Sequence, residues 1–449
     1  MTAVAPVRAN TSIAGAWAPG KNLAALFARQ QDAFDLINGL RSMSFLWILI
    51  FHTCYSYGMV AGKDSVFALS ESSPLLWWIF NADKAVDLFF ILSGFLISLI
   101  LFKEVNRTGT IQLGRFYFRR YLRLTPVYAL ILFLYWLSGG RNHEYVWANL
   151  FYVNNFLELD QMALQWTWTL AVEEQFYLLL PLLLIVIARM PGQPFLRVLG
   201  GLLALSFVAR LAAFYFLPDM WSSDYRALLT DKEICPTFYT NIYDNLITRY
   251  GPFVCGTFAA CAYCFHREQL TTWLLTHRRT FFAINLLMAT LTLFFLFFPV
   301  TNQVLEGGSW QLRTYLVVNR TLFSAGIAWF MLTVFLQLHN GHWLARALSI
   351  RLWQPFSQLT YSMYLVHMIV IIGVMFQINY LFNHQLAIAD ATWRIFATLT
   401  VTATLSLMIT MLIGVLCWLL VEKPFLNLRD RAATSRGATT AAPIQHSLG

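Results

Sequence analysis

Long apolar segments are the feature that most constrains the fold of this chain. Ten of them can be read along the sequence: 43–60, 76–101, 122–139, 172–189, 197–217, 250–266, 280–298, 316–338, 360–382 and 395–420. A helix needs about 20 mostly apolar residues to cross a hydrocarbon core of about 30 Å. Only 12% of the residues are charged, against about 25% in soluble domains. We therefore predict an all-α fold, a polytopic membrane helix bundle with about ten transmembrane helices.

The positive charge of the chain fits a membrane protein. The formal net charge is +9, but the cations are spread among the loops and form no separate basic domain, so we expect no nucleic-acid partner. When the N-terminus is placed inside, most of the 31 lysines and arginines fall in the inner loops and the two ends. Cytoplasmic loops carry such an excess. We therefore predict cytoplasmic termini and membrane lipids as partners.

Three parts follow from this pattern. Residues 1–35 are expected to be a partly disordered cytoplasmic segment, residues 36–425 the transmembrane domain, and residues 426–449 a disordered cytoplasmic tail. Within the first part, the spacing of apolar residues over 21–36 is typical of a helix in the membrane interface. We expect no cleavable signal and no soluble domain after the last span. The six cysteines lack the paired spacing of a metal site, so no metal is expected.

The first span carries an arginine and a histidine. Arg41 and His52 are eleven residues apart, which is a rise of about 16 Å and a rotation about 20° beyond three full turns. Both side chains therefore lie on one face, with His52 near the middle of the bilayer when Arg41 is at the inner boundary. An ionisable residue at that depth is a functional candidate. The alternative is a histidine that a neighbouring helix satisfies.

The second span places an acid at a similar depth. Asp87 can fix the tautomer of a histidine and stabilise its charged form, or it can pair with Lys84 one turn away and be structural. Ser93 and Gly94 follow on the same span. Small residues allow helices to pack closely, and this is the favoured interpretation when the two residues are considered alone. The alternative is that they leave a narrow passage.

Four arginines lie within nine residues at the inner end of the third span, Arg115, Arg119, Arg120 and Arg123. Guanidinium groups suit bidentate binding of phosphate. The alternative is that they orient the span and contact lipid headgroups.

Other candidates lie on the fourth and ninth spans. Glu173 and Glu174 are adjacent, so they point about 100° apart and at most one is expected to face His52. Acids near the start of a helix are also favoured by its dipole. His367 lies about two turns into the ninth span and is a further candidate.

Together these stretches resemble the acyltransferase-3 family of integral-membrane acyltransferases, which is chiefly bacterial. Arg41 and His52 match its basic residue followed by ten spacers and a histidine. Further matches, in the same order, are Phe89, Phe90, Ser93 and Gly94 for FFxxSG, Arg120 and Arg123 for RxxR, and the stretches "VEEQFYLLLPLL", "YSMYLVH" and "VEKPF". The sequence departs from the family at Ser42, Thr169 and Ala171, and none of these replaces a titratable group.

The resemblance implies transfer of an acyl group, commonly acetyl, from cytoplasmic acyl-CoA to a hydroxyl of a carbohydrate or glycolipid of the cell envelope. No bound cofactor is expected, because acyl-CoA is a substrate. Arg119, Arg120 and Arg123 are then candidates for binding the donor. Phe89, Phe90, Ser93 and Gly94 are candidates for lining its passage. A bacterial inner membrane is the expected location.

In this scheme His52 is the catalytic base or a transient acyl carrier, and the residues leave both open. Arg41 positions the donor or balances charge. Asp87, Glu173 or Glu174 orients the imidazole. The alternative function is a transporter or flippase for a lipid-linked glycan or small solute, and a non-catalytic export helper is a third. Turnover of labelled acyl-CoA to free CoA distinguishes the enzyme from the transporter, and a substitution of His52 without effect would favour the export helper.

Overall fold

The computed structural model describes residues 13–28, 35–191, 194–299, 307–338, 343–386 and 391–430. Over these ranges the chain forms helices and no strand, so the prediction of an all-α fold is confirmed. The ten helices that correspond to the predicted spans are α3 (Asp35–Ala61), α6 (Asp83–Thr108), α7 (Leu113–Leu137), α9 (Trp168–Arg189), α10 (Phe195–Tyr215), α15 (Gly251–Phe265), α17 (Arg278–Leu296), α18 (Trp310–Phe335), α20 (Trp353–Tyr380) and α21 (Ala391–Cys417).

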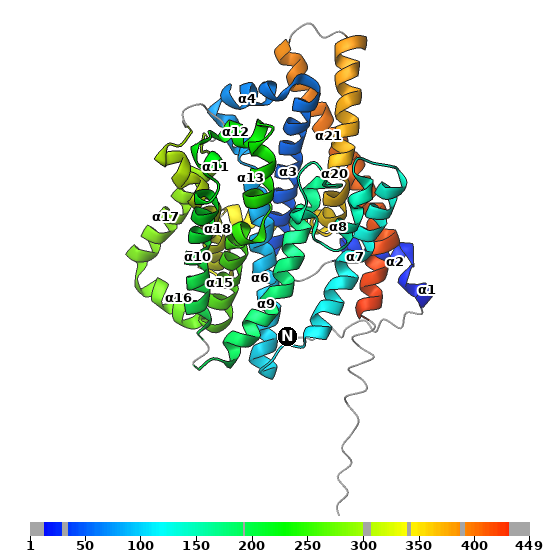
Figure 1. Cartoon of the computed structure of the whole chain (residues 1–449). Coiled ribbons are helices and arrows are strands. Elements are labelled where there is room, and N and C mark those ends of the chain that lie inside the picture. Colours follow the sequence, from blue (N-terminus) through cyan, green and yellow to red (C-terminus); the bar gives the residue numbers. More distant parts are fainter. Residues whose placement is uncertain are drawn as a thin grey trace, which may run out of the picture.

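Eight of these helices are long and apolar enough to cross a membrane, judged over the described residues. The other two are α7, which is long but begins with the four arginines, and α15, which has only 15 residues. Both are nevertheless part of the bundle, since α15 packs against α6 and α18 and α7 packs against α20. The long helices run side by side along one axis (Figure 1).

Short helices connect the spans. On the side predicted to be outside they are α4 (Lys63–Glu71), η1 (Pro74–Leu76), α5 (Trp77–Phe80), η2 (His143–Tyr145), α8 (Val146–Leu150), η3 (Asn154–Phe156), η4 (Gln165–Thr167), α11 (Pro218–Ser222), α12 (Tyr225–Thr230), α13 (Ile234–Phe238), η5 (Tyr239–Tyr243), α14 (Leu246–Arg249) and η6 (Leu381–Gln385). The inner connections contain α16 (Arg267–Thr276) and α19 (Trp343–Leu348). Figure 1 shows α4, α12 and the outer turn between α20 and α21 at the opposite end of the bundle from α16.

The two described ends of the chain contact each other. Helix α2 (Pro19–Phe27), which follows α1 (Ile13–Ala16), lies against η7 (Trp418–Glu422). The indole of Trp17 donates a hydrogen bond to the carbonyl of Leu420 (3.2 Å), and that of Trp418 donates to the carbonyl of Asn22 (3.3 Å). Both ends therefore lie at the same end of the bundle, as an even number of crossings requires.

The predicted end segments differ in part from the structure. Helix α2 begins two residues before the segment 21–36 predicted to be interfacial and covers its first part, whereas residues 29–34 lie outside the described residues. The chain is helical from Lys423 to Asp430, so the predicted disordered tail cannot begin at residue 426. Residues 431–449, the rest of that tail, and residues 1–12 lie outside the described residues.

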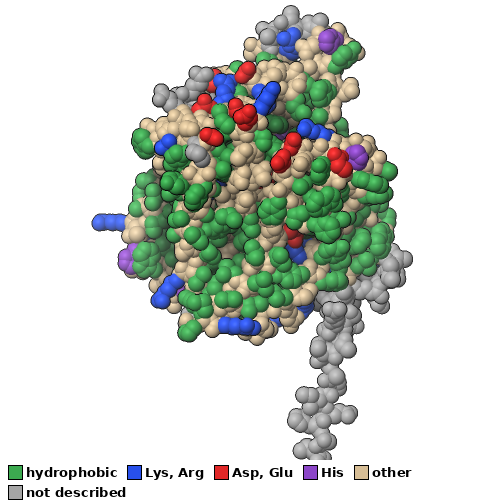
Figure 2. Space-filling model, viewed as in Figure 1, with side chains coloured by type: hydrophobic (Ala, Val, Ile, Leu, Met, Phe, Trp, Pro, Cys, Tyr) green, Lys and Arg blue, Asp and Glu red, His purple; other side chains and the backbone are tan. Residues whose placement is uncertain are grey.

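The surface fits a lipid environment. Large apolar side chains such as Phe282, Leu412 and Val208 are more than half exposed. Figure 2 shows hydrophobic side chains over most of the middle of the visible face, while acidic side chains lie mostly toward the end that carries α4 and α12 and basic side chains lie toward both ends. A soluble protein rarely exposes apolar patches of this extent, so the protein is an integral membrane protein.

Close packing of α6 on α15 uses two glycines. A Cβ on Gly94 would lie 2.2 Å from the carbonyl oxygen of Phe253, and one on Gly256 would lie 2.1 Å from that of Ile91. Phe90 is fully buried and its ring stacks on Phe253 with centroids 4.2 Å apart. Gly94 and Phe90 therefore serve helix packing, as small and apolar residues do in membranes. The prediction that these two line a passage is wrong.

Candidate functional site

His52 is paired with a second histidine. Nδ1 of His52 on α3 lies 2.8 Å from Nε2 of His367 on α20. The two rings are nearly parallel, with centroids 5.0 Å apart. Helices α3 and α20 pack along their length, and this packing brings together two histidines that are 315 positions apart in sequence.

The backbone fixes the tautomers of both rings. Nδ1 of His367 lies 2.6 Å from the carbonyl oxygen of Tyr364, which can only accept, so this nitrogen carries the proton. In a neutral imidazole the other nitrogen is then an acceptor. His52 must therefore donate from Nδ1, and its Nε2 carries a free lone pair. Nε2 has no hydrogen-bond partner within the described part of the chain.

The rest of the chain holds His367 in place and leaves His52 accessible. His367 is fully buried, and its ring packs against those of Phe45, Trp166 and Tyr364. The indole of Trp166 donates a hydrogen bond to the backbone carbonyl of Leu365 (3.2 Å). The hydroxyl of Tyr364 donates one to the backbone carbonyl of Trp166 (2.7 Å). The His52 side chain is only partly buried. One ring is thus fixed, and the other presents a basic nitrogen to open space.

Arg41 lies inward of His52 on the same helix and among other charged groups. The carboxylates of Glu173 and Glu422 attract its guanidinium group, and Arg120 repels it. These neighbours come from α9, η7 and α7, so four parts of the bundle meet around Arg41. The predicted roles of Arg41, positioning the donor or balancing charge, stay predictions.

Neither Glu173 nor Glu174 contacts His52. The hydroxyl of Ser93 donates to Oε1 of Glu173 at 2.7 Å. Oε1 of Glu174 is buried and has no hydrogen-bond partner among the described residues, and Arg120 lies close enough to attract it. Both acids therefore belong to the arginine side of the site. Neither is the group that orients the imidazole of His52.

The arginines of α7 differ from one another in placement. The guanidinium carbon of Arg120 lies 3.7 Å from the centre of the Tyr177 ring, a cation–π contact. Arg123 interacts electrostatically with Arg41 and Glu422. Arg119 is exposed and is not among the groups that act on Arg41 or Arg123. Arg120 and Arg123 thus join the site, while Arg119 is separated from it.

Glu422 was missed as a site residue. It is buried, and the hydroxyl of Ser362 donates to its Oε2 at 2.9 Å. Arg123 and Arg41 both attract its carboxylate. The available signal was an acid next to a lysine in "VEKPF", at the end of an apolar run. As a match to the family, this stretch assigns no role to Glu422. In the structure Glu422 is the last residue of the π-helix η7, and a π-helical turn frequently marks a functional position.

Asp87 belongs to a separate buried cluster of charges. Arg320 donates to its Oδ2 at 3.1 Å, and Arg249 lies 3.3 Å from its Oδ1. Lys84 pairs with Asp83 at 3.4 Å and donates to the Tyr315 hydroxyl at 2.9 Å. Asp87 therefore does not orient His52, whose ring partner is His367. The structural interpretation fits, but the direct partners of its carboxylate are two arginines from α18 and α14, and Lys84 pairs with Asp83.

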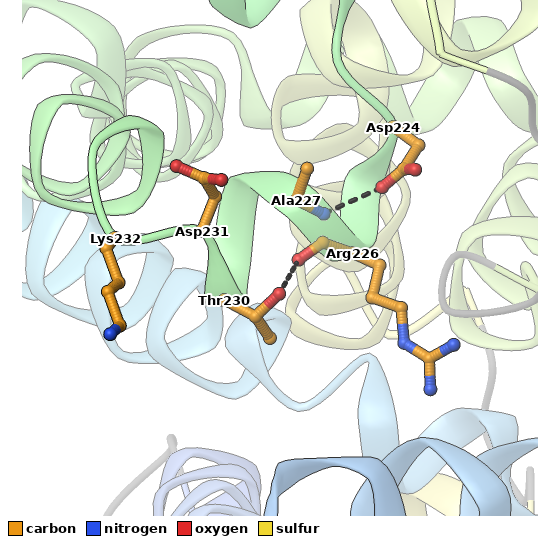
Figure 3. Close-up of a pocket in the computed structure, with 6 residues that line it drawn as sticks. All are labelled: Asp224, Arg226, Ala227, Thr230, Asp231 and Lys232. Carbon is orange, nitrogen blue, oxygen red and sulfur yellow. Dashed lines mark hydrogen bonds between the residues drawn. The ribbon is translucent and has the colours of Figure 1, made fainter.

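The outer surface has an open hollow beside α12. Figure 3 shows its lining: Asp224, Arg226, Ala227, Thr230, Asp231 and Lys232. Its acids are already engaged, since Asp224 accepts from the amide of Ala227 (2.7 Å) and Asp231 accepts from the amides of Glu233 and Ile234. Hydrogen bonds from two amides hold the pKa of Asp231 below its ordinary value. The hollow holds neither histidine of the pair.

Similarity to known proteins identifies the family of the chain. A family model described as an acyltransferase domain matches residues 34–419. The chain belongs to the acyltransferase-3 family. It is 28% identical over 378 residues to nose resistant to fluoxetine protein 6 of Caenorhabditis elegans. The alignment covers 75% of this chain and 44% of that protein.

Two bacterial relatives are matched over shorter stretches. A putative O-acetyltransferase of Staphylococcus aureus is 31% identical over 34% of this chain and 24% of its own length. A peptidoglycan O-acetyltransferase of Listeria monocytogenes is 30% identical over 35% of this chain and 29% of its own length. The chain thus spans less than half of these relatives. No solved structure matches it.

Proposed function

We propose that this membrane protein transfers an acyl group, most simply acetyl, from acyl-CoA on the cytoplasmic side to a hydroxyl of a carbohydrate on the other side. His52 is the general base. The observation that carries the proposal is the free lone pair on Nε2 of His52, which follows from the hydrogen bonds through His367 to the carbonyl of Tyr364. A base needs an unprotonated nitrogen within reach of the proton it takes.

The donor end of the proposed site is basic. Arg41, Arg120 and Arg123 lie close enough to act on one another electrostatically, and guanidinium forks suit the phosphates of acyl-CoA. Arg41 is about 16 Å inward of His52 along α3, so a donor whose phosphates lie near Arg41 can extend its thioester toward His52. Arg119 is left out of this role because of its placement.

The proposed reaction is a direct transfer. Nε2 of His52 takes the proton of the acceptor hydroxyl as its oxygen attacks the thioester carbonyl. The carbon–sulfur bond then breaks, and the imidazolium returns the proton to the leaving thiolate. The products are the acyl ester and free CoA. His367 holds the tautomer of His52 and, as a hydrogen-bond acceptor, stabilises the imidazolium that His52 becomes. The aspartate has the same role in a Ser-His-Asp triad.

The names of the relatives support a cell-envelope acceptor. Two bacterial relatives are named as O-acetyltransferases, and one of these names specifies peptidoglycan. We accordingly place the chain in a bacterial inner membrane with an envelope carbohydrate or glycolipid as acceptor.

Reconstituted vesicles test the function. The purified protein is inserted into liposomes, labelled acetyl-CoA is supplied to one face at a time, and free CoA is measured. We expect turnover only when acetyl-CoA is on the face that carries Arg115 and Arg119. Transport of label without release of CoA would instead establish the transporter. Charge reversal of Arg123 should weaken binding of acetyl-CoA in calorimetry, and unchanged binding would remove Arg123 from the donor site.

A further inference from the structure

A group of tyrosines lies on the outward side of the histidine pair. Tyr55 follows His52 by three residues on α3, which places it about 4.5 Å further outward. Tyr239 and Tyr243 come from η5 in the outer loop, and their rings stack with centroids 4.9 Å apart. Tyr239 interacts electrostatically with Tyr55 and Tyr364. Residues from α3, α20 and the outer loop therefore meet above His52.

The tyrosines border accessible space. Tyr55 is 50% exposed, and it faces the outer loop, since Cys235 of α13 lies close enough to act on it. The side chains of Tyr239, Tyr243 and His52 are partly exposed. Within the described residues the hydroxyls of Tyr55 and Tyr239 have no hydrogen-bond partner. Accessible surface thus continues from the outer loop toward the basic nitrogen of His52.

The charged groups that border Tyr243 are buried or compensated. Arg249 and Arg320 lie against the Tyr243 ring, each with its guanidinium carbon 5.3 Å from the ring centre. Both arginines are buried and paired with Asp87. Asp244, next to η5, is also buried. An anionic ligand above His52 would therefore find aromatic rings and neutral hydroxyls, with no exposed cation among these groups.

We infer that Tyr55 and Tyr239 form the acceptor subsite, and that it takes a neutral sugar ring which presents one hydroxyl to Nε2 of His52. The apolar face of a pyranose packs on an aromatic ring, while a phenolic hydroxyl supplies a hydrogen bond at the edge. The partly exposed ring of Tyr239, on the side away from Tyr243, suits the first contact, and the hydroxyl of Tyr55 suits the second. This inference rests on the proposed function, because it names the substrate class of the same site.

Binding of a matched pair of sugars to the detergent-purified full chain tests the inference. The neutral probe is methyl β-glucopyranoside, and the anionic probe is methyl β-glucuronide, which differs only in a carboxylate. We expect calorimetry to detect the neutral probe and to give at least about tenfold weaker binding of the anionic one. Replacing Tyr239 by Ala should weaken binding of the neutral probe about tenfold, the order expected for loss of one aromatic stack. Tyr239→Phe should retain most of it.

Controls separate the subsite from folding and from the proposed function. Tyr215 is 70% exposed on α10, and Tyr215→Ala should leave sugar binding unchanged. Release of CoA from acetyl-CoA with water as acceptor should be the same in Tyr215→Ala and wild type. Absence of any sugar binding by the wild-type protein, preference for the anionic probe, or equal binding by Tyr239→Ala would overturn the inference. Failure of the wild type to release CoA would instead reject the proposed function.

Discussion

The imidazole of His52 receives its orientation from His367, whose Nε2 lies 2.8 Å from Nδ1 of His52. A hydrogen bond to the Tyr364 carbonyl fixes the proton on the far nitrogen of His367. The two bonds form a chain that begins at a backbone carbonyl and ends at a free lone pair. Because a carbonyl cannot donate, the direction of this chain does not depend on a charged group.

Replacement of His367 tests its positioning role. His367→Ala should lower kcat for acyl transfer by about 100-fold or more, because His52 loses the acceptor that fixes its tautomer, while the KM for acyl-CoA stays near that of the wild type. His367→Gln should restore part of the rate through its amide oxygen. His277, an exposed histidine whose Nδ1 also meets a backbone carbonyl, gives the control variant His277→Ala. A rise in KM with unchanged kcat would argue against positioning.

Glu422 should oppose binding of the donor. Its carboxylate attracts Arg41 and Arg123, the groups proposed to meet the phosphates, so Glu422→Gln should lower the dissociation constant of acyl-CoA. The same change should lower the unfolding temperature, because the arginines lose a compensating charge. Calorimetry and thermal unfolding measure the two effects. Glu268→Gln, on exposed α16, is the control. Weaker donor binding by Glu422→Gln would mean that Glu422 positions the arginines.

The cluster around Asp87 should be structural. Asp87 is fully buried between Arg249 and Arg320, and removing one partner of a buried ion pair costs about 3–5 kcal/mol. Asp87→Ala should therefore lower the unfolding temperature and the yield, while the folded fraction keeps a kcat near that of the wild type. Normal stability combined with lost activity would return Asp87 to the catalytic site.

Asp244 in the outer loop should make stability depend on pH. Both of its carboxylate oxygens are buried without hydrogen-bond partners among the described residues. Burial raises its pKa from 3.8 to about 8. Between these values the folded state binds more protons than the unfolded state, so this residue lowers stability as pH rises from about 4 to about 8. Asp244→Asn should thus gain stability relative to the wild type at pH about 8.5 and much less at pH about 5.

Thermal unfolding at the two pH values measures this gain. Asp219→Asn is the control, since Asp219 is exposed in the same loop. An Asp244→Asn variant whose difference from the wild type is the same at both pH values would contradict the assignment.

The sequence predicted the helices and part of the site. Apolar length alone determines where spans lie, and the eleven-residue spacing placed Arg41 and His52 on one face because both are on one helix. The partner of His52 could not be predicted in this way. It lies on α20, and nothing in local spacing tells which helix packs against α3.

The errors have the same physical origin. Asp87 looked available to His52 by depth, but three helices bring Arg249 and Arg320 to it in three dimensions. Phe90 and Gly94 face α15, whereas Ser93, one residue before Gly94, faces α9 and reaches Glu173. One helix thus divides a single motif between packing and the site. Glu422 was missed since its two arginines come from other helices.

The central claim is that Nε2 of His52 takes the proton of the acceptor. Release of CoA from labelled acetyl-CoA, measured for His52→Ala and wild type at equal membrane levels, tests it most directly. Loss of a general base typically costs about 10²–10⁴-fold, so the account predicts a fall of at least about 100-fold with acetyl-CoA binding retained. Turnover by His52→Ala at the wild-type rate would contradict it.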